Sequence, residues 1–164
     1  MSGVVPTVRQ PGEGERRWFY GGGVHEWKVT AAESGGDFLL FEDTMERGKV
    51  TPLHTHPASE TMYVVAGEVL LHIDGAEYRI GEGAVAVAPR DVPHAFMVLS
   101  ESATLLCLQA PCCQAFYLGA SEPLDESTER VVDFERVAAS ARSNGGITIV
   151  GPPPFALAGG SPEA

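Results

Sequence analysis

One short stretch of this chain directs three metal-binding side chains toward a single point. From Gly48 to Glu60 it reads Gly-Lys-Val-Thr-Pro-Leu-His-Thr-His-Pro-Ala-Ser-Glu. In an extended segment, side chains two residues apart point to the same side, so His54 and His56 can bind the same ion. Pro57 lacks an N–H and interrupts the strand, so we expect a turn that brings Glu60 back beside both histidines.

A second segment supplies one more imidazole, at His94. A single histidine on a half-buried strand is often just a core residue, but four ligands in two matching segments are a much stronger signal. Three imidazoles and a carboxylate suit a divalent first-row transition metal such as Fe, Ni, Mn, Co or Cu. We therefore predict that one ion is bound by His54, His56, Glu60 and His94.

Together the two segments resemble the two motifs of the cupin superfamily. The first matches the family pattern at both glycines, both histidines and the glutamate. The second keeps the glycine, proline and histidine, with Asp91 where a glycine is usual and Val98 where an asparagine is usual. Aspartate tolerates left-handed backbone geometry better than most residues. The resemblance covers roughly residues 38–117 and implies a double-stranded β-helix, or jelly-roll barrel, with its ligands pointing inward.

The rest of the pattern also favours an all-β barrel, because many short apolar segments alternate with turns. Asp74-Gly75 is a strong two-residue hairpin signal between the strands expected at 68–73 and 76–80. His72 therefore lies on a hairpin strand away from the motifs, and we do not expect it to bind the metal.

Past residue 123 the pattern changes to apolar residues at helical spacing, up to Ala141, with Gly145 just beyond. This predicts a short C-terminal helix packed on the barrel, followed by a strand at 147–150. We expect residues 1–30 to be irregular and residues 159–164 to be disordered.

The 164 residues fit a single cupin domain, 1–164. We place the barrel core at about 36–118, an N-terminal arm at 1–35, and the helix and tail at 119–164.

The net charge and the cysteine content limit the classes of binding partner and the cellular compartments that we expect. A net charge of −11 argues against a nucleic-acid-binding surface and against binding to an anionic membrane. The sequence has no apolar run of about 20 residues and no signal-peptide core, so we expect a cytoplasmic location. Cys107, Cys112 and Cys113 are odd in number, and two are adjacent, which predicts free thiols.

Alternation along the motif strands predicts apolar walls beside the ion, which suit an aromatic substrate. Arginines and lysines do not cluster in the motifs, which argues against a phosphorylated sugar. The side chains predicted to line this pocket are Met62, Val64, Phe96 and Val98.

Among cupins, the chain is most similar to small bacterial quercetinase-like, or flavonol 2,4-dioxygenase-like, proteins. Residues 51–57, 60–68, 88–96 and 149–153 carry this similarity. It implies a metal-dependent dioxygenase that acts with O2 on an aromatic or enolic, flavonol-like substrate, with Glu60 as catalytic base as well as ligand. The alternatives are an isomerase, cyclase or lyase that uses the ion as a Lewis acid, and a non-catalytic small-molecule-binding barrel. Apolar residues on both faces of 62–66 also favour a homodimer.

Overall fold

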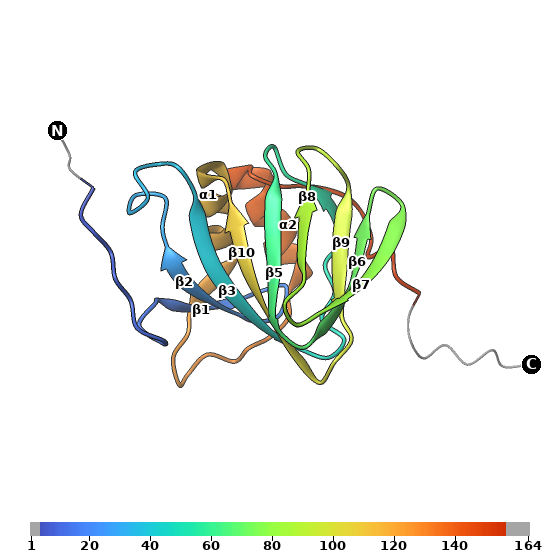
Figure 1. Cartoon of the computed structure of the whole chain (residues 1–164), viewed down its shortest axis with the longest axis horizontal. Helices are drawn as coiled ribbons and strands as arrows, with labels where there is room; N and C mark the ends of the chain where they lie inside the picture. The colour runs from blue at the N-terminus through green and yellow to red at the C-terminus, as the bar shows by residue number, and fades with distance from the viewer. Residues whose placement is uncertain (1–3, 157–164) are drawn as a thin grey trace, which may run out of the picture.

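Two antiparallel sheets form the body of the protein in the computed structural model, which describes residues 4–156 (Figure 1). The larger sheet has the order β11-β1-β2-β3-β10-β5-β8. Its strands are β1 (Arg16–Phe19), β2 (Val24–Val29), β3 (Leu39–Glu46), β5 (Glu60–Ala66), β8 (Val85–Ala88), β10 (Ser102–Gln109) and β11 (Ser121–Pro123). The smaller sheet has the order β12-β4-β9-β6-β7, with β4 (Leu53–Thr55), β6 (Glu68–Ile73), β7 (Ala76–Gly81), β9 (His94–Val98) and β12 (Thr148–Gly151). The predicted all-β architecture is confirmed.

The hydrophobic core lies between the sheets and follows the two-residue period of the strands. In β3, Leu39, Phe41 and Met45 are at most 2% exposed and Asp43 is 5% exposed, whereas the residues that alternate with these four are more exposed. Burial of each large apolar side chain contributes roughly 1.5–3 kcal/mol. The strands that carry the predicted ligands therefore enclose a closely packed core.

The N-terminal segment was predicted to be irregular, and for residues 16–29 this was wrong. Strands β1 and β2 form a hairpin and extend the larger sheet, with β1 between β2 and β11. The prediction failed because these strands are short and are separated by three glycines, which read as a loop. Their placement brings His25 opposite Asp43 of β3.

Three helical segments follow the barrel strands: η1 (Pro111–Cys113), α1 (Gln114–Gly119) and α2 (Phe134–Asn144). The C-terminal helix is confirmed, and Asp133 caps its start by accepting a hydrogen bond from the backbone N–H of Arg136. Helix α2 packs on α1, where the Ser140 hydroxyl donates to the carbonyl of Phe116. Phe116 and Val137 of these helices also belong to the core cluster.

The turns have the backbone conformations that their residue types predict. Asp74 and Gly75 have φ of 50° and 78°, as a primed hairpin turn requires, and Asp91 adopts a φ of 59°. The predicted strand near 147–150 is β12, and the three cysteines are free thiols. The tail expected at 159–164 lies outside the described residues. Within residues 4–156, no helix is long and apolar enough to cross a membrane.

Candidate metal centre

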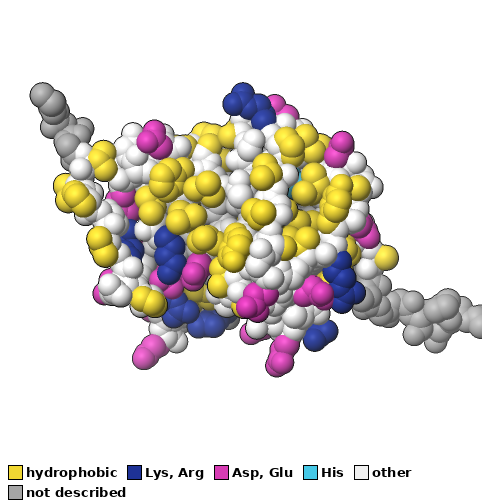
Figure 2. Space-filling view, in the orientation of Figure 1, with side chains coloured by type: hydrophobic (Ala, Val, Ile, Leu, Met, Phe, Trp, Pro, Cys, Tyr) yellow, Lys and Arg dark blue, Asp and Glu magenta, His cyan; other side chains and the backbone are white. Residues whose placement is uncertain are grey.

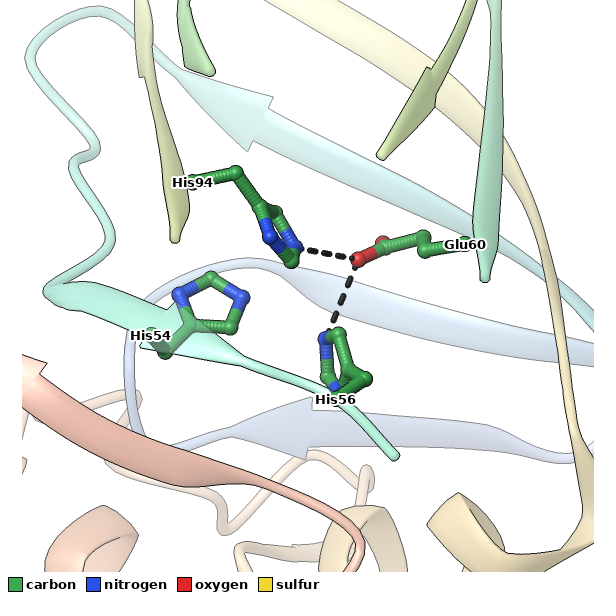
Figure 3. A group of neighbouring side chains, drawn as sticks. All are labelled: His54, His56, Glu60 and His94. Carbon is green, nitrogen blue, oxygen red and sulfur yellow. Dashed lines mark hydrogen bonds and ion pairs between the residues drawn. The ribbon is translucent and has the colours of Figure 1, made fainter. Parts of the chain in front are cut away.

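The structure brings the four predicted ligands together, and Figure 3 shows their side chains pointing toward one another. His54 on β4 and His94 at the start of β9 are directly paired across the smaller sheet. His56 follows β4, and Glu60 begins β5 in the larger sheet. Their potential ligand atoms all lie within 4.8 Å of one another, and each side chain belongs to a buried residue.

Each of the three imidazoles is held by a backbone carbonyl behind it. The Nδ1 atoms of His54 and His94 lie 2.7 and 2.8 Å from the carbonyl oxygens of Pro52 and Val92. The Nδ1 of His56 lies 2.8 Å from the carbonyl oxygen of Gly146, in the loop after α2. Because a carbonyl can only accept, each Nδ1 carries the proton and each Nε2 keeps its lone pair. This is the tautomer that a metal-binding histidine needs.

The donor set fits a divalent cation. The Glu60 carboxylate oxygen lies 3.1 Å from His56 Nε2 and 3.0 Å from His94 Nε2. With Nδ1 already protonated, these nitrogens and the carboxylate face one another as acceptors, and a cation between them removes the repulsion. The buried Nε2 of His56 has no hydrogen-bond partner among the described residues.

The pKa values of Glu60 and His54 favour the protonation states in which these side chains bind a cation. Burial raises the pKa of Glu60, but His56 and His94, which donate to the carboxylate when their Nε2 atoms are protonated, outweigh burial and hold the pKa well below its usual range. Burial, together with the neighbouring His94 and His56, lowers the pKa of His54 to about 3. Glu60 is therefore ionised and His54 neutral at physiological pH, which are the ligand forms that bind metal.

Metal affinity is expected to fall in mild acid. Burial lowers the pKa of His56, but the Glu60 carboxylate, 3.1 Å from its Nε2, outweighs burial and raises the pKa above the usual 6.5. The ion must displace this proton, so apparent affinity drops by up to about tenfold per pH unit below that pKa and levels off above it. Zn²⁺ titrations by calorimetry between about pH 5.5 and pH 7.5, in two buffers of different ionisation enthalpy, would count the released protons. Affinity that does not change with pH would contradict this ligand assignment.

The site opens onto a cavity of about 50 Å³. Three of the four ligands line it, all except His56, and most of the wall is aromatic or aliphatic. Ligand pockets for drug-sized molecules measure roughly 300–1,000 Å³, so this cavity is small. Its wall includes Phe19, Phe41, Phe96, Phe116, Tyr117, Phe134, Val137 and Ile147.

Of the four side chains predicted to line the pocket, the structure places Phe96 on the cavity wall. Met62, Val64 and Val98 also point inward, as alternation requires, but they are at most 2% exposed and belong to the packed core cluster. Alternation gives the face of a strand but not the level along the barrel at which the cavity lies.

The cavity also contains polar residues that were not expected there: His25, Asp43, Lys49 and Tyr117. His25 and Asp43 are 1% and 5% exposed, and His25 Nε2 lies 3.6 Å from Asp43 Oδ2. Lys49 Nζ donates to the carbonyl of Gly21 at 2.5 Å, and burial lowers its pKa to about 8 although Asp43 acts in the opposite direction. In the sequence, the only sign of these residues is a polar side chain at an inward-facing position of a strand. That sign does not reveal that they line one cavity.

Comparison with known proteins agrees with this geometry. Residues 41–108 match the sequence model of the family described as Cupin domain. The chain has the fold of the cupin superfamily. No curated protein sequence matches the chain significantly.

Several solved structures share the fold. KdgF from Halomonas sp. is 20% identical, with a TM-score of 0.58 over 65% of this chain and 94% of that one. An RmlC-like cupin from Shewanella frigidimarina is 18% identical, with a TM-score of 0.60 over 68% and 96%. The polyketide cyclase RemF from Streptomyces resistomycificus is 16% identical, with a TM-score of 0.59 over 83% and 98%.

Proposed function

We propose that this protein is a metal-dependent dioxygenase that acts on an aromatic or enolic, flavonol-like substrate. The observation that carries the proposal is the convergence of three Nε2 atoms and an ionised carboxylate on one point beside an aromatic cavity. His54, His56, Glu60 and His94 would hold the ion, which would supply a binding site for an oxygen-donor substrate and for O2.

The aromatic wall and Glu60 would supply the substrate pocket and the catalytic base. The aromatic wall would pack against the reacting end of a planar substrate and would exclude water from the ion. Glu60 is ionised and faces the same point as the histidines, so its carboxylate can take the proton of a substrate hydroxyl as well as bind the metal. These two roles of Glu60 make it the proposed catalytic residue.

The test begins with elemental analysis of protein purified without chelators or an affinity metal. We expect about one Fe, Ni, Mn, Co or Cu per chain, and O2 uptake with quercetin or a smaller enolic aromatic. Glu60→Gln keeps an oxygen ligand but removes the base, so this variant should bind metal and turn over far more slowly. Turnover that is equally fast without O2 would rule out the dioxygenase.

The second candidate is a cyclase, isomerase or lyase that uses the ion only as a Lewis acid. The similarity to the polyketide cyclase RemF favours it, because that similarity covers 83% of this chain and so extends beyond the cupin domain. This candidate predicts anaerobic turnover that survives replacement of the native ion by redox-inactive Zn²⁺. Binding without any product would instead indicate the non-catalytic alternative.

We also propose a homodimer in the cytoplasm, a location that the three free cysteines support. The outer face of the larger sheet carries exposed apolar side chains, and Figure 2 shows them gathered over β3, β10, β5 and β8. Contiguous apolar patches of this kind mark association surfaces. The most exposed members are Val85 and Val87 on the edge strand β8, with Tyr63, Val65 and Leu108 beside them.

Replacing Val85 and Val87 together with lysine is expected to convert the dimer to a monomer, because two charges would be buried at the interface. Light scattering should give twice the chain mass of 17.4 kDa for the native protein and the single chain mass for the variant. The control replaces Tyr78 and Val150, which are similarly exposed on the smaller sheet, with lysine. A native protein that is already monomeric would disprove the dimer.

A further inference from the structure

A second and larger hollow lies next to the metal cavity. It has a volume of about 600 Å³, within the range of ligand-binding sites. Four residues line both spaces: Gly21, Lys49, Val50 and Phe134. We call the larger hollow the arginine groove. Because the two spaces share these walls, the arginine groove is adjacent to the metal cavity and separated from it by Lys49 and Phe134.

The arginine groove gathers the unpaired cations of an acidic chain. The chain has 11 lysines and arginines and a net charge of −11. Among the described residues, six of these cations form ion pairs, namely Arg9, Arg17, Lys28, Arg79, Arg136 and Arg142. Of the five others, four line this groove: Arg16, Arg47, Lys49 and Arg130.

The groove is built for an anion with an aromatic body. Glu46 is the carboxylate among its lining residues, so positive charge outweighs negative charge there. The indole of Trp18 and the ring of Phe134 provide flat apolar wall. The floor is the Gly21–Gly23 turn, where a Cβ on Gly23 would lie 2.6 Å from Asp43 Oδ1. Arginine side chains recognise carboxylate and phosphate oxygens with paired hydrogen bonds.

We propose that the substrate is an aromatic acid whose carboxylate or phosphate binds Arg16, Arg47 and Arg130 while its enolic end passes Lys49 to reach the metal. This inference rests on the proposed function and specifies its substrate class. It also accounts for the size of the metal cavity, because about 50 Å³ admits the reacting end of a molecule whose remainder lies in the arginine groove.

Calorimetry on the full-length protein, as purified and after chelation, tests the arginine groove. The probes are 2-naphthoate, 2-naphthyl phosphate and the neutral 2-naphthamide. The variant R16Q/R47Q/R130Q is compared with R79Q/R90Q/R142Q, which removes the same charge elsewhere. We expect the groove variant to bind the preferred acid about tenfold more weakly or worse, the control to change by less than about twofold, and the amide to bind weakly to all.

The preference between the two acids identifies a carboxylate or a phosphate as the natural anion. Equal loss in both triple variants, equal affinity for the amide and the acids, or no binding of either acid would each overturn the proposal. If the triple variant fails to fold, as judged by circular dichroism, the single variant Arg47→Gln replaces it, and an affinity unchanged from the native protein would overturn the proposal in the same way.

A second measurement separates this inference from the metal chemistry. In Mn²⁺-loaded protein, the paramagnetic ion should broaden the proton resonances of the bound acid, and R16Q/R47Q/R130Q should abolish the broadening at the same probe concentration. If the acid bound to Mn²⁺-loaded protein without broadening of its resonances, the acid would not reach the metal site from the arginine groove, and the proposal would be overturned. Failure to load Mn²⁺ would count against the proposed function and leave the calorimetric result standing.

Discussion

Replacing His94 with alanine is expected to lower the affinity for a divalent metal by more than about 100-fold. His94 Nδ1 is held by the carbonyl of Val92, and its Nε2 faces Glu60 at 3.0 Å. The substitution removes one of four protein ligands and leaves the Glu60 carboxylate buried with one partner fewer. Calorimetric titration with Zn²⁺ or Co²⁺ measures the loss directly.

His72→Ala is the matched control. His72 also lies on a strand of the smaller sheet, but its ring packs edge-on against Phe155, with ring centroids 6.4 Å apart, and it is not one of the four clustered ligands. Its removal should leave metal affinity within about threefold of the native value. An equal loss of affinity in both variants would refute the ligand assignment.

Gly146→Ala is expected to weaken metal binding about 10- to 100-fold without touching a ligand. Gly146 has a φ of +77°, and a Cβ there would lie 2.6 Å from the carbonyl oxygen of Cys112. The backbone must therefore move, and with it the carbonyl that accepts the Nδ1–H of His56. His56 would lose the contact that fixes its tautomer and ring orientation.

Gly145→Ala separates this effect from general backbone strain. Gly145 also has a positive φ, +65°, but a Cβ there has no neighbour within 4 Å. Both variants should lose thermal stability because alanine is strained at positive φ, whereas the large loss of metal affinity should be confined to Gly146→Ala. If the two variants bound metal equally well, the carbonyl of Gly146 would have no part in the site.

Apart from His94, which lies 34 positions beyond Glu60, the clustered side chains could be predicted because their spacing is local. His54 and His56 share a strand face, and a single turn at Pro57 returns the chain to Glu60. The same holds for the hairpin at Asp74-Gly75 and for the stop of the C-terminal helix at Gly145, where the residue type itself determines the backbone geometry. These features depend on a few neighbouring residues.

What the sequence did not reveal depends on distant pairing. His56 is oriented by Gly146, 90 positions along the chain, through a backbone carbonyl that any residue type could provide. Arg16, Arg47 and Arg130 meet in one groove only because β1 joins the larger sheet, and β1 is too short and too close to glycines to be recognised. The position of the cavity along the barrel is likewise a property of three-dimensional packing.

The contact between the carbonyl of Gly146 and His56 also has a consequence for the order in which the site forms during synthesis. On the ribosome the fourth ligand, His94, is synthesised 52 residues before Gly146, a delay of about 3–10 s at typical elongation rates. Strand β12, which pairs with His54, arrives later still. A nascent chain thus holds all four clustered side chains before it holds the carbonyl that orients His56, so we expect tight binding of an ion only when synthesis is nearly complete. On this reasoning, we expect the metal to be selected after translation, among the ions that the finished protein meets.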